Sequence, residues 1–133
     1  MNILSGHISD ILVNESLSMV SIRINEHIEL KTILVETPET ASYLKIENVV
    51  EVLFKETEVI ISKEDTNSIS IQNKIKAIIK KIKKGVLLSR LTLNSEIGDI
   101  IAIITTEALD ELALTENQEI IAMIKVNEIM ISR

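Results

Sequence analysis

The chain has 133 residues and a formal net charge of −6; 46% of its residues are hydrophobic and only 2% are aromatic. The core is therefore expected to be aliphatic and rich in Ile and Val, which favour strands. The absence of cysteine excludes disulfides, thiolate metal sites and cysteine nucleophiles. No apolar run approaches the roughly 18 residues of a membrane helix, and no basic-then-apolar leader opens the chain, so we expect a soluble, cytoplasmic protein with no membrane partner.

One sequence pattern occurs twice, about 70 residues apart. The copies are residues 50–62 and 120–132, and each places a Lys three positions before a Glu. A duplicated unit of this length is a small domain, so we predict two tandem modules, residues 1–63 and 67–133, with a hinge at 63–67. Modules of roughly 60–65 residues are marginal alone, which favours packing on each other or on further chains.

Charge is shared unevenly between the two repeats. Residues 1–63 carry 5 Lys/Arg against 10 Asp/Glu, whereas residues 64–133 carry 9 against 10. The difference comes from a basic cluster of Lys74, Lys76, Lys80, Lys81, Lys83, Lys84 and Arg90. We interpret this cluster as a solvated strand face. A nucleic-acid-binding barrel would stack bases on aromatic side chains, and only Tyr43 and Phe54 are present, so no nucleic acid partner is expected.

The first repeat follows the plan of the second, with a shorter loop near Asn25. Its helix is predicted to take Thr37 as N-cap and Pro38 as the first helical residue, and to end near Tyr43.

The second repeat shows its elements more clearly. Apolar residues and alternation predict strands at Ser68–Ile79, Val86–Leu93 and Ile97–Thr105, with a polar stretch over Lys80–Gly85 and a turn at Gly85. Helical spacing then predicts a two-turn helix through Ala108, Leu109 and Leu112, with Thr105 or Thr106 as its N-cap. Two strands close the unit, Glu119–Lys125 and Glu128–Ser132.

Five strands with a helix between the third and fourth is the order of a small oligonucleotide/oligosaccharide-binding (OB) barrel. We therefore predict a mostly β protein made of two tandem OB-like five-stranded barrels, each with one short helix. Strand pairing does not follow from the pattern.

Three ordered blocks of the second repeat resemble the molbindin family, whose tandem Mop or TOBE modules ("di-Mop") bind molybdate. The blocks are Ile69 to Lys76 (ISIQNKIK), Ala102 to Leu112 (AIITTEALDEL) and Ala122 to Ile131. The resemblance implies TOBE/Mop-type barrels that hold a tetrahedral oxyanion where subunits meet.

The resemblance also implies which residues contact the anion. On this chain the matching positions and their neighbours are Ser70, Gln72, Asn73, Thr105, Thr106, Ala108, Lys125 and Val126. Gln72 stands where the family usually has Arg, and Ala108 where it usually has Ser. In the first repeat the same positions are matched to Ile3, Ser5, Gly6, Val35, Pro38 and Lys55, so only Lys55 remains as a weaker candidate.

The chemistry of these residues suits an anion. A dianion needs preorganised donors, and a helix N-terminus presents unpaired N–H groups and a partial positive charge. The hydroxyls of Ser70 and Thr105 can also donate, and Lys125 adds a full charge.

The resemblance thus implies a non-enzymatic protein that binds, stores or buffers molybdate, or tungstate, in molybdenum homeostasis. It implies no organic cofactor and a homo-oligomer, with a trimer favoured over a dimer. A ligand-sensing or protein-interaction module with a degenerate anion site is the alternative. An enzyme is least supported, because His7 and His27 are the only histidines and neither has an evident partner base.

Overall fold

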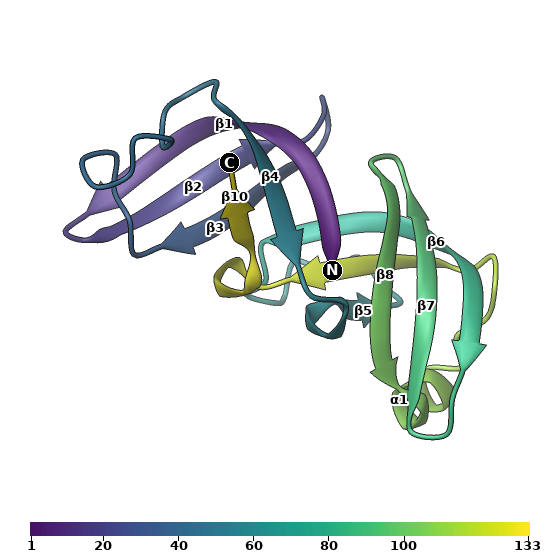
Figure 1. Ribbon diagram of the computed structural model, residues 1–133. Coiled ribbons are helices and arrows are strands. Elements are labelled where there is room, and N and C mark those ends of the chain that lie inside the picture. Colours follow the sequence, from purple (N-terminus) through teal and green to yellow (C-terminus); the bar gives the residue numbers. More distant parts are fainter.

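The computed structural model describes residues 1–133 and shows two lobes, each built around a five-stranded antiparallel sheet (Figure 1). The first repeat contains β1 (Asn2–Asn14), β2 (Leu17–Arg23), β3 (Glu29–Leu34), β4 (Val49–Phe54), a 3₁₀-helix η1 (Glu56–Glu58) and β5 (Ile60–Ser62). The second contains β6 (Asn73–Lys84), β7 (Leu88–Ser95), β8 (Gly98–Thr105), α1 (Thr106–Glu111), β9 (Glu119–Ile124), η2 (Val126–Glu128) and β10 (Met130–Ser132). The predicted mostly β fold of two tandem five-stranded modules is confirmed.

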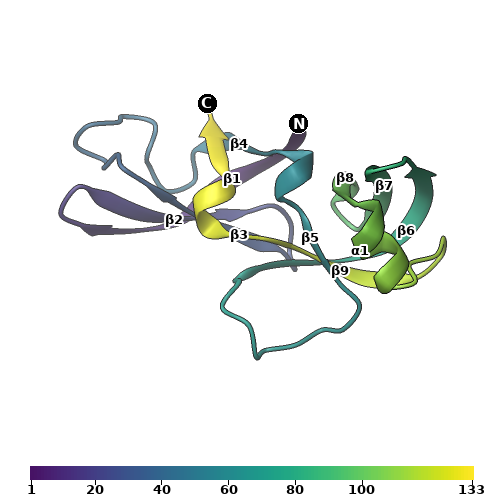
Figure 2. The same ribbon diagram turned by 90° about the horizontal axis from the view of Figure 1, so that it is seen from below.

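Each sheet takes one edge strand from the other repeat. The strand orders are β10-β4-β1-β2-β3 and β5-β9-β6-β7-β8. In the ladders, Ile131 lies opposite Val52, and Ile61 lies opposite Ala122. Figure 2 shows β10 reaching the first lobe while the linker after β5 loops away from both sheets. Each sequence repeat therefore leaves its last strand in the sheet of its neighbour, which joins the lobes through backbone hydrogen bonds.

The core is aliphatic, as the composition predicts. One cluster of 25 buried residues runs through both lobes, and its only aromatic member is Phe54. The largest fully buried side chains are Phe54, Ile8, Ile22, Leu30, Ile75, Ile79, Leu91, Leu93, Ile100, Ile120, Met123 and Ile124. Since the cluster spans both sheets, the two repeats share a core instead of holding two separate ones.

The first strand of each lobe is long and pairs with two neighbours. The first half of β6 pairs with β9 and its second half with β7, with an irregularity between Ile79 and Lys81. Such a bulge bends a strand and allows it to serve both sides of a small barrel. The predicted end of this strand at Ile79 is wrong, because the strand continues through the polar stretch to Lys84. The predicted start at Ser68 is also wrong, since pairing begins at Asn73.

The helix predicted from Pro38 to Tyr43 is wrong, because this segment forms turns. Only one helix-type bond forms, from the Ala41 N–H to the Thr37 carbonyl (2.8 Å). The Tyr43 hydroxyl donates to the Glu36 carboxylate (2.6 Å), and burial together with this bond raises the pKa of Tyr43 to about 12. The Thr40 Oγ1 also accepts from the Thr37 N–H (2.9 Å), and a local side-chain bond of this kind gives the segment a non-helical alternative.

Candidate functional site

Thr105 is the N-cap of α1 and is one of the two residues predicted for that position. Thr105 has extended backbone angles, and its Oγ1 accepts a hydrogen bond from the Ala108 N–H (3.1 Å). This is the geometry by which a Thr before a helix satisfies one of the unpaired N–H groups. Both residues remain accessible at the surface.

Thr106 is buried and supports the start of α1 from below. Its Oγ1 donates to the Gly85 carbonyl (2.9 Å) and lies 2.8 Å from Ser89 Oγ, while its N–H donates to the Leu87 carbonyl (2.9 Å). A Cβ at Gly85 would collide with the Leu88 carbonyl oxygen, so glycine suits this close approach. The hydroxyl of Thr106 is thus committed to the fold, although the resemblance placed it beside the anion.

Thr105 and Ala108 line an open cavity of about 430 Å³ that both repeats build. The full lining is Thr57, Val59, Ile60, Ile61, Leu88, Ile103, Ile104, Thr105, Ala108 and Leu112. The contribution of η1 and β5 depends on the strand exchange, so no signal in the sequence could have found Thr57 or Ile60. The lining contains no cation, and a dianion placed there would lack a countercharge within this cavity.

Asn73 joins the two lobes. Its Oδ1 accepts from the Lys31 N–H (2.7 Å), and its Nδ2 donates to the Lys31 carbonyl (2.8 Å). Asn2 makes the same pair of bonds with the backbone of Ile101, at 2.8 and 2.9 Å. The side chain predicted to contact an anion is only 1% exposed and is used in this joint.

The ladder also corrects the matching of the repeats. Asn2 lies opposite Phe54, and Asn73 lies opposite Ile124, so Asn2 is the counterpart of Asn73. Gly6 instead lies opposite Val50. The predicted match of Asn73 to Gly6 is therefore wrong, and so are the matches of Ser70 to Ile3 and of Gln72 to Ser5, which use the same offset.

The remaining predicted residues lie around the start of β6 and the end of β9. Ser70 and Gln72 precede β6, and both are exposed. Because Asn73 lies opposite Ile124, Gln72 and Lys125 follow directly beyond the paired ends of adjacent strands. Lys125 is exposed, and its ammonium group has no hydrogen bond or ion pair within the chain; Val126 begins η2 beside it.

Lys55 occupies the matching position before η1. It too is exposed, and its carbonyl accepts from the Glu58 N–H (3.0 Å), as that of Lys125 accepts from Glu128 (3.0 Å). Neither lysine lines the Thr105 cavity. The structure thus divides the predicted set into a capped turn at the cavity and a separate group near the end of β9.

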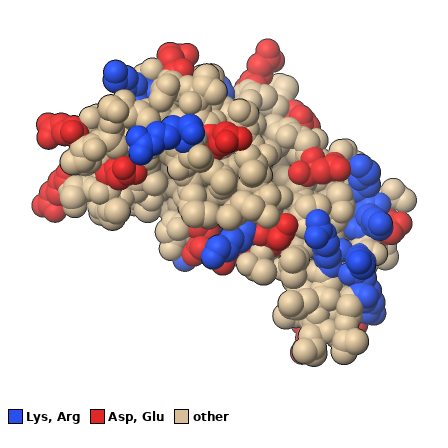
Figure 3. Space-filling view, viewed as in Figure 1, with Lys and Arg blue, Asp and Glu red and all other residues tan.

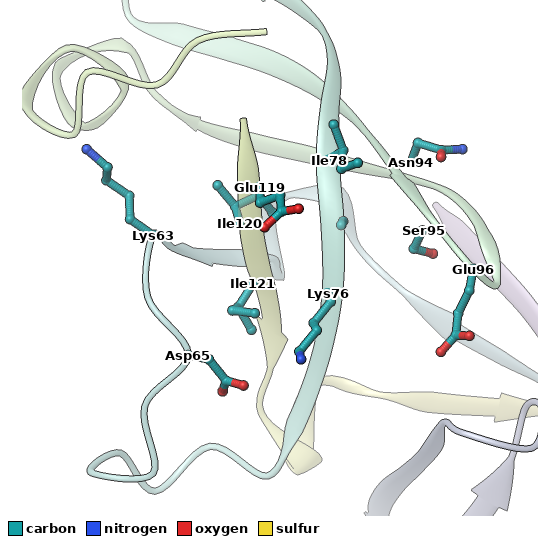
Figure 4. A pocket seen from close by; sticks show the side chains of 11 residues that line it. Lys63, Asp65, Lys76, Ile78, Asn94, Ser95, Glu96, Glu119, Ile120 and Ile121 are labelled. Carbon is teal, nitrogen blue, oxygen red and sulfur yellow. The ribbon is translucent and has the colours of Figure 1, made fainter. Parts of the chain in front are cut away.

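The largest cavity, about 620 Å³, lies elsewhere, between the linker after β5 and the β6–β9 face (Figure 4). Its charged lining consists of Lys63, Lys76, Asp65, Glu96 and Glu119. Three carboxylates against two ammonium groups do not suit a dianion, because carboxylates accept hydrogen bonds and repel negative charge. No cluster of three or more His, Cys, Asp or Glu residues is placed to hold a metal ion. The structure also lacks any helix with the length and apolar character that crossing a bilayer requires.

Comparisons with known proteins concern both the second repeat and the whole chain. Residues 69–131 match the TOBE domain. Molybdenum-pterin-binding proteins 1 and 3 of Clostridium pasteurianum are 35% and 32% identical to the chain over 65 residues, which is 48% of this chain and 96% of each relative. The structure of the cytoplasmic molybdate-binding protein ModG with molybdate bound superposes with a TM-score of 0.88, at 21% identity, over 98% of this chain and 94% of ModG. At that identity the likeness shows a shared fold.

Proposed function

The chain belongs to the molbindin (Mop) family of TOBE-domain proteins, and on this premise we propose that it binds molybdate, or tungstate, without catalysing a reaction. Its role is storage or buffering of the oxyanion in molybdenum homeostasis, in the cytoplasm. The most direct support from the geometry is the capped turn of Thr105 and Ala108, which opens on a surface cavity built by both repeats. The anion itself is the ligand, and no organic cofactor takes part.

The proposed site needs a positive charge from outside its own cavity. The Thr105 cavity contains no cation, while Lys125 is exposed and unpaired. A Lys125 from a neighbouring subunit, with Ser70, Gln72 and Val126 beside it, would supply the charge and further donors. Lys55 is the weaker candidate for the same role. The anion would then lie between subunits and help to hold them together.

A homo-oligomer is supported by the apolar surface of the single chain. Val86, Val35 and Leu87 are 93%, 80% and 80% exposed, and Val49 is 71% exposed. Val86 and Leu87 are adjacent and almost fully exposed, and neighbouring apolar side chains of this kind suit a surface that a partner covers. We favour a trimer over a dimer on the resemblance of tandem modules to trimeric family members.

Native mass spectrometry with molybdate, tungstate and sulfate in parallel tests the proposal. We expect an oligomer that retains molybdate or tungstate and loses sulfate. Lys125→Ala should reduce anion retention about tenfold, the effect of losing one charge-assisted contact. Lys45→Ala, an exposed lysine far from the site in sequence, is the matched control and should retain the anion normally.

Two results would overturn the proposal: an oligomer that stays empty in excess molybdate and tungstate, or a Lys125→Ala variant that binds as well as the wild type. A ligand-sensing or protein-interaction module with a degenerate site is the second candidate. It is supported by Gln72 and Ala108, which replace the usual Arg and Ser. An empty oligomer would favour this second function.

A further inference from the structure

A hollow on the outer surface of the second lobe is lined only by Lys81, Lys83, Arg90 and Thr92, here called the basic face. Its volume is about 300 Å³. Lys83 lies opposite Arg90, and Lys81 lies opposite Thr92, on the paired strands β6 and β7. Lys and Arg side chains gather over this part of the second lobe in Figure 3. The basic face is separate from the Thr105 cavity, with which it shares no lining residue.

The three cations of the basic face have no partner in the chain. The flanking Lys80 and Lys84 are paired with Asp99 (3.1 Å) and Asp110 (2.8 Å), so these two carboxylates already have cationic partners. A further neighbour, Glu116, accepts from the Ile82 N–H at the strand edge (3.4 Å). Like charges directly opposite each other in a ladder are destabilising, so the Lys83–Arg90 pair lowers the stability of the folded state.

The first lobe shows that the fold does not need this charge. Its first strand carries the same irregularity, between Ile8 and Asp10, and the same antiparallel pairing with the next strand. The counterparts of the basic face, read from the two ladders, are Asp10, Leu12, Met19 and Ser21. One backbone arrangement thus carries three cations in one lobe and none in the other, within a chain whose net charge is −6.

We propose that the basic face binds an anion of linked phosphates, such as an inorganic polyphosphate or the phosphate chain of a nucleotide. Cα atoms of opposite residues are about 5 Å apart, and alternate residues along a strand about 7 Å apart. Cations spread over this area match several charged groups in a row better than one compact dianion. The Arg90 fork can bind phosphate oxygens in pairs, Lys81 and Lys83 add charge, and the Thr92 hydroxyl donates.

A nucleic acid fits the basic face less well. Base stacking needs aromatic side chains, and both aromatic residues, Tyr43 and Phe54, belong to the first repeat. The basic face therefore offers contacts to phosphate groups but none for stacking bases.

Isothermal titration calorimetry with the full chain at low salt tests this inference. The probes are tripolyphosphate, ATP without divalent metal, orthophosphate and oligothymidylate. We expect tripolyphosphate to bind, orthophosphate to bind about tenfold more weakly, and Lys83→Gln/Arg90→Gln to weaken tripolyphosphate binding about tenfold. The control Lys45→Gln/Lys76→Gln removes the same charge from other surfaces and should change the affinity less than about twofold. Similar affinities for tripolyphosphate and ATP indicate a free phosphate chain, whereas a tighter ATP complex indicates a nucleotide.

A reverse variant guards against an effect of folding alone. Asp10→Lys/Leu12→Lys/Met19→Arg transfers the charges to the first lobe and should raise the number of tripolyphosphate ions bound per chain. The inference is overturned if tripolyphosphate does not bind the wild type, or if the double Gln variant binds it unchanged. Tighter binding of oligothymidylate than of tripolyphosphate at the same residues would also overturn it, in favour of a nucleic acid surface. Molybdate retention should be the same in the double Gln variant and the wild type, since the two sites are separate.

Discussion

The two repeats differ most in the segment that follows their third strands. After β8, Thr105 caps a helix, and the buried Thr106 hydroxyl bonds to the Gly85 carbonyl. After β3, the matching positions are Val35 and Glu36; Val35 cannot cap, and Glu36 turns to the Tyr43 hydroxyl. The two segments thus differ at the positions where the helix begins, although the strands before them are similar.

Two matching serines, one in each lobe, also differ in their hydrogen bonding. Ser89 in β7 lies 2.8 Å from the Thr106 hydroxyl, whereas its counterpart Ser18 in β2 has a fully buried Oγ with no hydrogen-bond partner. A buried polar group without a partner costs free energy. Both lobes therefore bury a serine at this position, but only the second lobe supplies a hydroxyl that bonds to it.

The largest expected effect tests what the repeats share. Asn73→Ala removes two hydrogen bonds between the lobes and leaves the partly buried N–H and carbonyl of Lys31 without these partners. We expect a loss of about 3 kcal/mol in the free energy of unfolding, measured with urea. Asn2→Ala should cost a similar amount, because Asn2 makes the same contacts with Ile101. Asn14→Ala, at an exposed strand end, is the control, and an equal loss there would refute the role of the joint.

The next effect separates the repeats. Thr106→Val removes the bond to Gly85 and leaves Ser89 without a partner, which should lower the free energy of unfolding by about 2 kcal/mol. Ser18→Ala, at the matching serine, should lose less than about 0.5 kcal/mol, or gain stability, because no bond is broken. Urea unfolding measures both variants. Equal losses in the two would contradict the difference drawn between the lobes.

A smaller effect concerns the cap. Thr105→Ala should destabilise the protein by about 1 kcal/mol, the usual cost of losing an N-cap hydroxyl. Val35→Thr in the first repeat should change stability by less than about 0.5 kcal/mol, because Glu36 remains bonded to Tyr43. Thermal unfolding together with far-ultraviolet circular dichroism checks both. A new helical signal in Val35→Thr would show that the cap alone decides the helix.

The smallest effect depends on pH. The pKa of Tyr43 is raised from 10.0 to about 12, so the folded state holds the phenolic proton more tightly than the unfolded state. This contribution is present below pH 10 and is lost as the pH rises toward 12. The Tyr43 side chain is only partly buried, so solvent screening reduces the contribution to about 1 kcal/mol. Tyr43→Phe should lose less stability than the wild type between pH 10 and 12 in urea titrations; parallel curves would exclude this contribution.

Much of the fold could be predicted from local pattern. Adjacent or regularly spaced residues are enough to indicate the 70-residue repeat, the alternation along β7 and the Thr105 cap. The false helix at Pro38 arose because Thr37 and Pro38 are good starting residues, while the contact from Tyr43 to Glu36 is not visible in a spacing rule. Thr37 and Pro38 are therefore suitable residues for a helix start, but no helix follows them.

The candidate site was less predictable than the fold. Thr105 and Ala108 lie together because they are close in the chain, and Lys125 lies at the surface, away from their cavity lining. Asn73 and Thr106 are used inside the protein, which residue type alone does not reveal. A polar side chain has the same identity whether it faces a ligand or a backbone carbonyl, and only its surroundings distinguish the two.

The sequence by itself determined two copies of an aliphatic β module, because hydrophobic periodicity and turn chemistry act over a few residues. Only the tertiary structure decided that β5 and β10 change places and that two asparagines join the lobes. A three-residue strand carries too little pattern to specify its partner. Its pairing follows from where η1 and η2 direct the chain, and that direction is set by contacts between residues nearly 100 positions apart, such as the bond from the Thr32 hydroxyl to the Ile129 carbonyl (2.6 Å).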